Sequence, residues 1–323
     1  MDKDSRRPDH PDYDCTTLHI PKECWTGKDP HTAKFTPAMG QYWTLKIDNF
    51  EKIFLFKLGK FYELFFKDAI ICQQLLDLNW MGGAKKLHVG FPEKALDKYL
   101  EILVNAGFKV AVIEQTETPK QLEERQKGMT GPKQKCVNRE ICNMVTKGTY
   151  KAAEQGYQPK YCLAIKKHGN EFGVTFFDVT TLEFHIGQFV DDENMSSLRT
   201  LICQIRPVEV IFEREMQGSD FIKMLKNSPT VPVFTALPTP KCYSFVKTSS
   251  RLQKYFGESA LPAILKKLQD SDQEFAFNAL GMSIAFLEDA LIVEQTIKPA
   301  IYHEFTPESS VRNEYMVLDA QAL

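Results

Sequence analysis

Apolar and polar positions in the first half of the chain follow strand spacing and helix spacing in turn. Ile53–Leu58 is almost continuously apolar, which predicts a strand buried on both faces. Residues 94–105 are apolar at helical spacing and precede Gly107, which predicts an amphipathic helix with a glycine stop. The other elements expected here are a helix from Thr36-Pro37, a helix over 68–78 with Ile70, Leu75 and Leu76 in the core, strands over 87–91, 108–114 and 141–149, and a helical piece over 123–128.

A second unit of the same kind begins near Tyr161. Apolar segments at 162–165, 172–178 and 184–189 are separated by turn residues, which predicts three consecutive antiparallel strands. A helix over 196–205, a strand over 208–212 and a long apolar-rich helix over 275–297 are expected to follow. Strands that alternate with helices at this spacing predict an α/β fold.

Length and composition limit the class of protein. A chain of 323 residues predicts about two domains, and 43% hydrophobic with 25% charged residues is typical of a soluble globular protein. Residues 1–34 are polar and lack periodicity, so we expect a linker that is disordered or only partly ordered. No apolar run has signal-peptide or membrane-spanning character.

Charge and cysteine content add little that is specific. The net charge is −2, but residues 35–150 hold 17 Lys+Arg against 13 Asp+Glu, which leaves +4 there and −6 elsewhere. A modestly basic segment beside an acidic one is weak support for a DNA-touching domain. The eight cysteines form no C-x-x-C pair, which predicts buried free thiols in a reducing compartment, the cytosol or the nucleus.

The most informative residues for chemistry are Phe61, Tyr62 and Glu63, preceded by Gly59 and Lys60. In an extended segment Phe61 and Glu63 share one face, while Lys60 and Tyr62 share the other. A protruding phenyl ring can slip between stacked bases, and an acid beside it can test a base edge. Gly59 suits a bend or a close approach to a ligand. An apolar run of this kind also suits an ordinary core, so the residues alone leave both interpretations open.

Five segments of the chain resemble the MutS family of DNA mismatch-recognition proteins, in particular the eukaryotic subunit that reads the lesion in the MutS-alpha heterodimer. Residues 59–64 resemble the mismatch-reading motif, and residues 90–93 and 112–119 resemble the landmarks that follow it. Residues 316–320 are similar to the opening of the lever region. The stretch 7–14, with 17–18 and 20–21, is similar to the segment upstream of the reading domain.

The resemblance implies a mismatch-binding domain over 35–155, a ribonuclease H-like connector over 156–295 and an incomplete lever region over 296–323. Its ligand would be double-stranded DNA with mispairs or small loops, and its full-length partner the second eukaryotic MutS homologue, in the nucleus. No G-x-x-x-x-G-K-[ST] phosphate loop occurs, so we expect a truncated chain without cofactor, whereas full-length family members use ATP and Mg²⁺.

By family position, Phe61 would be the intercalating wedge and Glu63 the base-edge contact. A carboxylate beside a polyanion is pushed toward its protonated form, so Glu63 could accept from or donate to a base. Leu58 and Met81 would pack against the distorted step or belong to the core, Lys60 would meet a phosphate or solvent, and Gly59 would lie close to the DNA. Other basic residues could neutralise phosphates or form a solvated face: Lys85, Lys86 and a run made of Lys120, Arg125, Lys127, Lys133, Lys135 and Arg139.

Two other classes of function stay open on the sequence. A ribonuclease H-like fold can carry a two-metal nuclease, for which Asp178, Glu183 and Glu209 are the candidate ligands, although their spacing is not diagnostic. An Asp178 that caps a strand end is the simpler interpretation. The chain could also be an interaction module that binds family partners without reading DNA.

Overall fold

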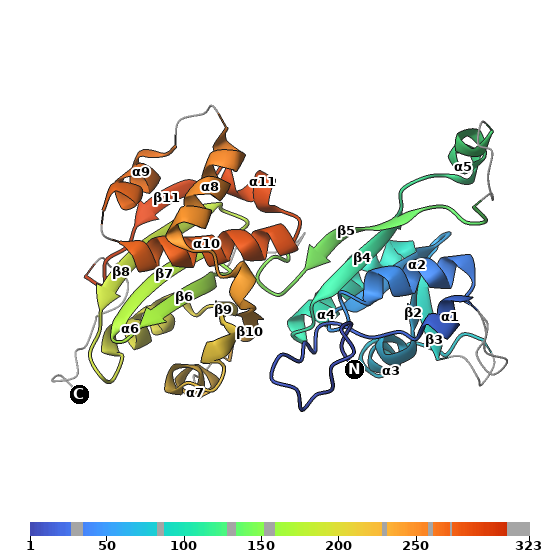
Figure 1. Ribbon diagram of the computed structural model, residues 1–323, viewed down its shortest axis with the longest axis horizontal. Helices are drawn as coiled ribbons and strands as arrows, with labels where there is room; N and C mark the ends of the chain where they lie inside the picture. The colour runs from blue at the N-terminus through green and yellow to red at the C-terminus, as the bar shows by residue number, and fades with distance from the viewer. Residues whose placement is uncertain are drawn as a thin grey trace. The chain divides into compact units, whose positions relative to one another are not determined.

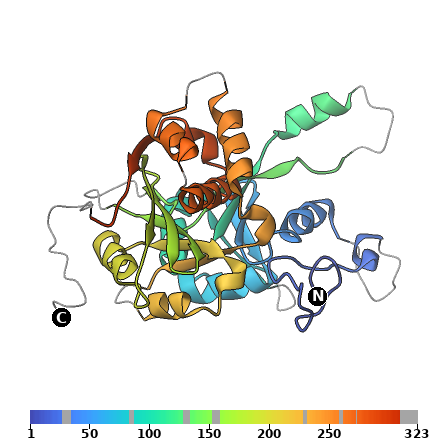
Figure 2. The same cartoon turned by 60° about the vertical axis from the view of Figure 1, so that its left-hand side comes forward.

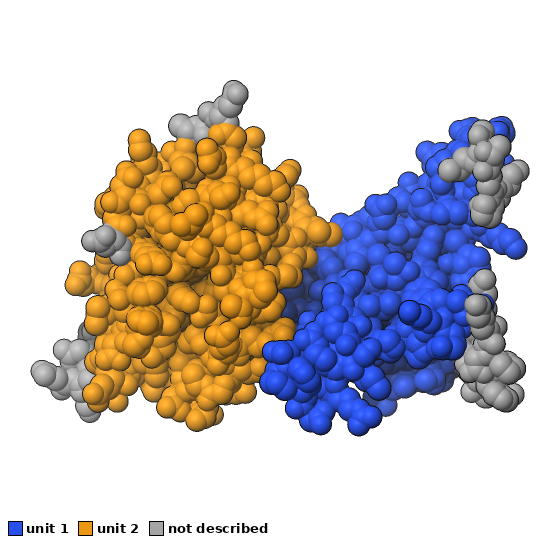
Figure 3. Space-filling view, in the orientation of Figure 1, with its two compact units in different colours: residues 1–146 blue, residues 147–323 orange. Residues whose placement is uncertain are grey.

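The structure is a computed structural model that describes residues 1–26, 35–82, 87–127, 134–151, 159–227, 231–257, 261–271 and 273–308. It contains two compact units, Met1–Thr146 and Lys147–Leu323, shown in Figure 3. Within the described ranges, no helix has the length and apolar character needed to cross a membrane. The predicted mixed α/β architecture is confirmed in both units.

The first unit is built on a five-stranded sheet with the order β3-β2-β1-β4-β5. Its central strands β1 and β4 are parallel, and the remaining pairs are antiparallel. The predicted strands of this domain are thus all present, with shifts of a few residues at their ends. Their bounds are β1 Ile53–Leu58, β2 Phe61–Phe65, β3 His88–Pro92, β4 Val110–Gln115 and β5 Arg139–Val145.

Helices cover both faces of this sheet (Figure 1). On one face, Tyr42 of α2 packs in a T-shaped geometry against Phe54, Phe56 and Phe65, with centroid distances between 5.3 and 5.8 Å. On the other, α3 lies against β2 and β3, and Tyr99 of α4 lies 4.6 Å from the Phe91 ring. The helices are α1 Lys22–Thr26, α2 Pro37–Lys46, α3 Phe66–Leu76, η1 Glu93–Ala95, α4 Leu96–Asn105 and α5 Pro119–Gln126.

Helix α3 turns a different side to the core than we predicted. Ile70 and Leu75 are exposed, at 41% and 38%, and only Leu76 of the predicted core residues is buried. The inward residues are Ala69, Cys72 and Leu76, at the spacing of one helical stripe. The apolar side chains outnumber the positions on that stripe, so composition could not identify the buried side.

A buried ion pair links α2 to α3 beside the first residues of β1. Lys46, the last residue of α2, lies 2.7 Å from Asp68 of α3, and the two side chains are 2% and 3% exposed. Asp68 also accepts a hydrogen bond from the backbone N–H of Phe54 at 2.9 Å. Burial lowers the pKa of Lys46 and raises that of Asp68, while their mutual attraction opposes both shifts.

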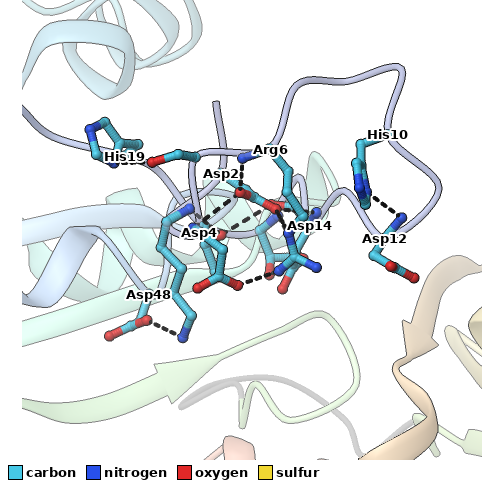
Figure 4. Close-up of polar contacts among 12 residues, drawn as sticks. Asp2, Asp4, Arg6, His10, Asp12, Asp14, His19 and Asp48 are labelled. Atoms are coloured by element: carbon cyan, nitrogen blue, oxygen red, sulfur yellow. Dashed lines mark hydrogen bonds and ion pairs between the residues drawn. The ribbon is translucent and has the colours of Figure 1, made fainter.

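The polar segment before α2, which we expected to be disordered or only partly ordered, is folded over residues 1–26 (Figure 4). The buried carboxylate of Asp2 accepts hydrogen bonds from the backbone N–H groups of Asp4, Arg6 and Asp14 at 2.8–3.1 Å, and the Arg6 guanidinium lies 3.0 Å away. Burial raises the pKa of Asp2, but these donors outweigh it and bring the pKa below its usual value. Polar residues here organise a buried charge, which a composition-based prediction of disorder could not detect.

The second unit contains a six-stranded sheet with the order β10-β9-β6-β7-β8-β11. The predicted antiparallel meander is confirmed as β6, β7 and β8, and β9 and β10 extend it in parallel beyond β6. Strand β11 pairs in parallel with β8, so this sheet continues past the boundary predicted at residue 295. The bounds are β6 Cys162–His168, β7 Glu171–Asp178, β8 Glu183–Val190, β9 Glu209–Glu213, β10 Val233–Leu237 and β11 Ile301–Glu304.

This sheet is also covered on both faces, with α10 along one and α6 and α7 on the other (Figures 1 and 2). The predicted helix over 275–297 is two helices, because Leu291 has φ 60° and interrupts the chain between α10 and α11. The prediction missed α7, β10, β11 and most of α8. The helices are α6 Ser196–Ile205, η2 Arg214–Met216, α7 Asp220–Lys226, η3 Thr239–Lys241, α8 Phe245–Phe256, α9 Ala263–Asp270, α10 Glu274–Asp289 and α11 Val293–Ile297.

Candidate nucleic-acid interface

The hairpin between β1 and β2 presents an aromatic ring at its tip. Leu58 pairs with Phe61 across the strands, so Gly59 and Lys60 form a two-residue turn, and Gly59 has φ 61°. Glycine at the first turn position is what a tight hairpin of this type requires. The Phe61 side chain follows directly and is 41% exposed. The structure therefore places the ring at the edge of the domain, next to a half-buried Leu58.

The predicted division of side chains between two faces is confirmed along β2. Tyr62 is 2% exposed, whereas Phe61 is exposed and Glu63 is partly exposed. The Tyr62 ring lies 5.8 Å from Phe91, and its hydroxyl donates to Glu114. Burial and this hydrogen bond raise the pKa of Tyr62. Tyr62 thus anchors the strand on the face that α3 and α4 cover, while its two neighbours point to the opposite, outer face, of which α2 covers the part around Phe54, Phe56 and Phe65.

Glu63 lies between two nitrogen-bearing side chains on that outer face. Its Oε2 atom is 2.6 Å from Nε2 of His88 on β3. From the β5 side, the Arg139 guanidinium lies over the Phe56 ring, 5.2 Å from its centroid, and Phe56 is the direct cross-strand partner of Glu63. Burial lowers the pKa of Arg139, and attraction to Glu63 is among the effects that raise it. Positive charge beside the acid offsets part of the repulsion that a polyanion would exert on it.

Gly90 makes room for this arrangement. A Cβ atom at Gly90, which pairs with Glu63 across the strands, would lie 3.4 Å from Cγ of Glu63 and 3.0 Å from the Met81 sulfur. Met81 is held there because its backbone N–H donates to the carbonyl oxygen of His88 at 2.8 Å. The structure therefore brings Met81 and Glu63 together over a glycine.

The other predicted contact residues have mixed outcomes. Lys60 lies exposed in the turn instead of within a strand, whereas Lys85, Lys86 and Lys133 lie outside the described residues. Arg139, predicted as a phosphate contact, is 8% exposed and donates to the backbone carbonyl oxygen of Lys57, so it is part of the fold. The exposed members of the basic run are on or near α5, at the end of an extension of β4 and β5 (Figures 1 and 2): Lys120, Arg125, Lys127 and Lys135.

Sequence reasoning missed His88 and the role of Gly90. The available signal was the alternation of residues 88–92, where Val89 and Phe91 share the buried face and His88 and Gly90 share the other. That signal gave no register against β2, and register decides which residues meet Glu63.

Two of the three candidate metal ligands in the second unit, Asp178 and Glu209, serve the fold. Asp178, the last residue of β7, accepts hydrogen bonds from the backbone N–H groups of Lys160 and Thr180 at 2.6 and 2.7 Å, which confirms the strand-end interpretation. Glu209 accepts from the Thr235 hydroxyl at 2.5 Å and the Gly148 N–H at 3.1 Å. In the described parts of the chain, no three His, Cys, Asp or Glu side chains are grouped to hold a metal ion.

The two mixed α/β units, the first of which carries this hairpin, match two models of one protein family in the order in which they follow along the chain. Residues 36–154 match the family model of MutS domain I, and residues 160–292 match that of MutS domain II. The chain therefore belongs to the MutS family.

Individual relatives agree with this assignment. The chain is 35% identical to the DNA mismatch repair protein Msh6 of Homo sapiens, over 95% of this chain and 24% of that protein. It is 34% identical to the probable DNA mismatch repair protein Msh6 of Drosophila melanogaster, over 100% and 30%, and 31% identical to MSH6 of Saccharomyces cerevisiae, over 88% and 24%. The chain thus spans 24–30% of the length of these relatives.

Proposed function

We propose that this chain reads mispaired bases in double-stranded DNA during post-replicative mismatch repair, with Phe61 as the wedge and Glu63 as the base-edge contact. The observation that carries the proposal is the Phe61 ring, 41% exposed at a hairpin tip and on the same face as Glu63. The buried Tyr62 between them holds the strand firmly, so the ring can enter a base step without unfolding its support.

The free energies of ring insertion favour entry at a mispair over entry at any base step. Burying the exposed part of a Phe ring gains about 1 kcal/mol, and stacking on a base adds about 1–3 kcal/mol. Opening a base step costs a few kcal/mol, and less where pairing is already defective. Gain and cost are therefore close, so the cheaper opening at a mispair decides where the ring enters.

Phosphate contacts would supply most of the affinity without specifying sequence. Lys60 lies exposed at the hairpin tip, and Lys120, Lys127 and Lys135 are exposed on or near α5. Each contact with a phosphate would contribute a salt-dependent share of binding. By analogy with longer family members, the proposed setting is the nucleus, in a heterodimer with the second eukaryotic MutS homologue. ATP and Mg²⁺ would act outside these two domains, to which we assign no cofactor.

The test is a titration of G·T-containing and fully paired duplexes at two salt concentrations, with and without Mg²⁺. Phe61→Ala should bring the affinity ratio between the two duplexes close to one, while most of the salt-sensitive binding persists. Phe66→Ala is the matched control, because Phe66 is the same residue type with the same 41% exposure and begins α3 directly after β2, away from the hairpin tip. A Phe61→Ala variant that keeps its preference would refute the wedge assignment.

Glu63→Gln tests the base-edge contact. It should change the relative affinity among mispairs without abolishing binding, because an amide replaces an acceptor-only group by one that can also donate.

Two further outcomes of the titration separate the other classes of function. Mg²⁺-dependent cleavage that disappears in Asp178→Asn would instead support a nuclease. Binding to neither duplex would leave an interaction module.

A further inference from the structure

The His88 imidazole fills the space between Glu63 and Phe65 on the outer face of the first sheet. His88 and Phe65 are direct cross-strand partners, and their rings are stacked with 4.8 Å between centroids and 18° between planes. The side chains of His88 and Glu63 are 18% and 17% exposed. The ring is therefore held by stacking on one side and by the carboxylate on the other.

The contact needs one proton between its two atoms. An ionised carboxylate only accepts hydrogen bonds, so with Glu63 ionised the hydrogen lies on Nε2 of His88, 2.6 Å from Oε2. Short N–H···O⁻ bonds are stronger than neutral ones and restrict the rotation of the acid. Among the described residues, the other carboxylate oxygen, Oε1, makes no hydrogen bond.

We propose that His88 is a positioning residue for mispair reading: its Nε2–H holds Oε2 of Glu63 and leaves Oε1 as a fixed acceptor for a base N–H. This inference rests on the proposed function. The buried Arg139 guanidinium is attracted to Glu63 and supplies a positive charge near the acid. Bases that offer an imino N–H, such as those of a G·T mispair, are then bound better than bases that offer only unprotonated ring nitrogens, as in A·C.

Two substitutions separate the donor from the ring. His88→Phe keeps an aromatic ring to stack on Phe65 but removes the donor, whereas His88→Gln loses the ring and keeps an amide N–H. His88→Phe should reduce the preference for G·T over paired DNA about tenfold, the value of one hydrogen bond to a charged group. His88→Gln should restore most of it, which loss of packing alone would not allow. In a Glu63→Gln background, His88→Phe should change the preference less than twofold.

A measurement on the unmodified chain without DNA gives a second readout. Nitrogen-15 NMR of His88 should show a protonated Nε2 at pH 7.5, and Glu63→Gln should shift that resonance. An unprotonated Nε2, or an unchanged preference in a folded His88→Phe variant, would overturn the proposal. These results are distinct from failure of the proposed function, in which the unmodified chain itself shows no preference or Phe61→Ala retains it.

Discussion

Breaking the buried Lys46–Asp68 pair should be the most damaging single polar change in the first unit. The two side chains are 2% and 3% exposed and lie 2.7 Å apart. At an effective dielectric constant of 20, their attraction is about 6 kcal/mol. Removing each ion from water costs several kcal/mol, so the intact pair adds little net stability. Lys46→Met or Asp68→Asn instead leaves one buried charge with an uncharged neighbour, which costs about 3–5 kcal/mol.

The assay can isolate the first unit. All three tryptophans, Trp25, Trp43 and Trp80, lie in it, so tryptophan fluorescence during urea unfolding reports on that unit alone. The matched control is Lys3→Met, because Lys3 and Asp48 are 2.8 Å apart but 48% and 58% exposed. That substitution should cost less than about 1 kcal/mol.

The double variant decides whether the reasoning is correct. Lys46→Met combined with Asp68→Asn removes both charges, keeps an oxygen that can accept the Phe54 N–H, and should recover stability to within about 1 kcal/mol of the original chain. Single variants that cost no more than Lys3→Met would refute the argument, since burial would then have no energetic consequence. A double variant as unstable as the sum of the singles would show that packing, and not an unpaired charge, is responsible.

Three further predictions concern backbone and pH. Gly59→Ala should destabilise the first unit by about 1 kcal/mol in the same fluorescence assay, because φ is 61° there; an unchanged midpoint would contradict the turn assignment. Gly173→Ala should cost about 1–3 kcal/mol by calorimetry, since its Cβ would lie 2.0 Å from the Phe275 backbone, whereas Gly218→Ala, with nothing within 4 Å, should be nearly neutral. Burial and the imidazole of His303, which is stacked on His185, lower the pKa of His185 from 6.5 to about 4. As the pH falls, the unfolded chain therefore binds this proton before the folded chain does. The unfolding free energy of the second unit should therefore fall by on the order of 2 kcal/mol between pH 6.5 and pH 4, and His185→Gln should flatten that dependence.

The pattern of apolar residues was enough to predict those elements that are stabilised by their own residues. The continuous apolar run of β1 and the helix of α6 were predicted at the bounds that the structure shows, because burial on both faces or one clear stripe leaves a plain pattern. Elements that depend on distant partners were missed. Strand β11 has four residues and exists because β8 offers a free edge for it, and the segment 1–26 is ordered by a carboxylate twelve positions from one of its donors.

The same distinction holds for the candidate site, where some features follow from the local pattern and others from tertiary packing. Alternation along β2 was enough to place Phe61 and Glu63 on one face and Tyr62 beneath them, since side-chain direction in a strand is a local property. The contacts of Glu63 with His88, the space over Gly90 and the approach of Arg139 depend on the register of β2 against β3 and on the path of β5. Register is decided by how whole strands pack, so a one-residue slip would have produced a different set of neighbours from the same sequence.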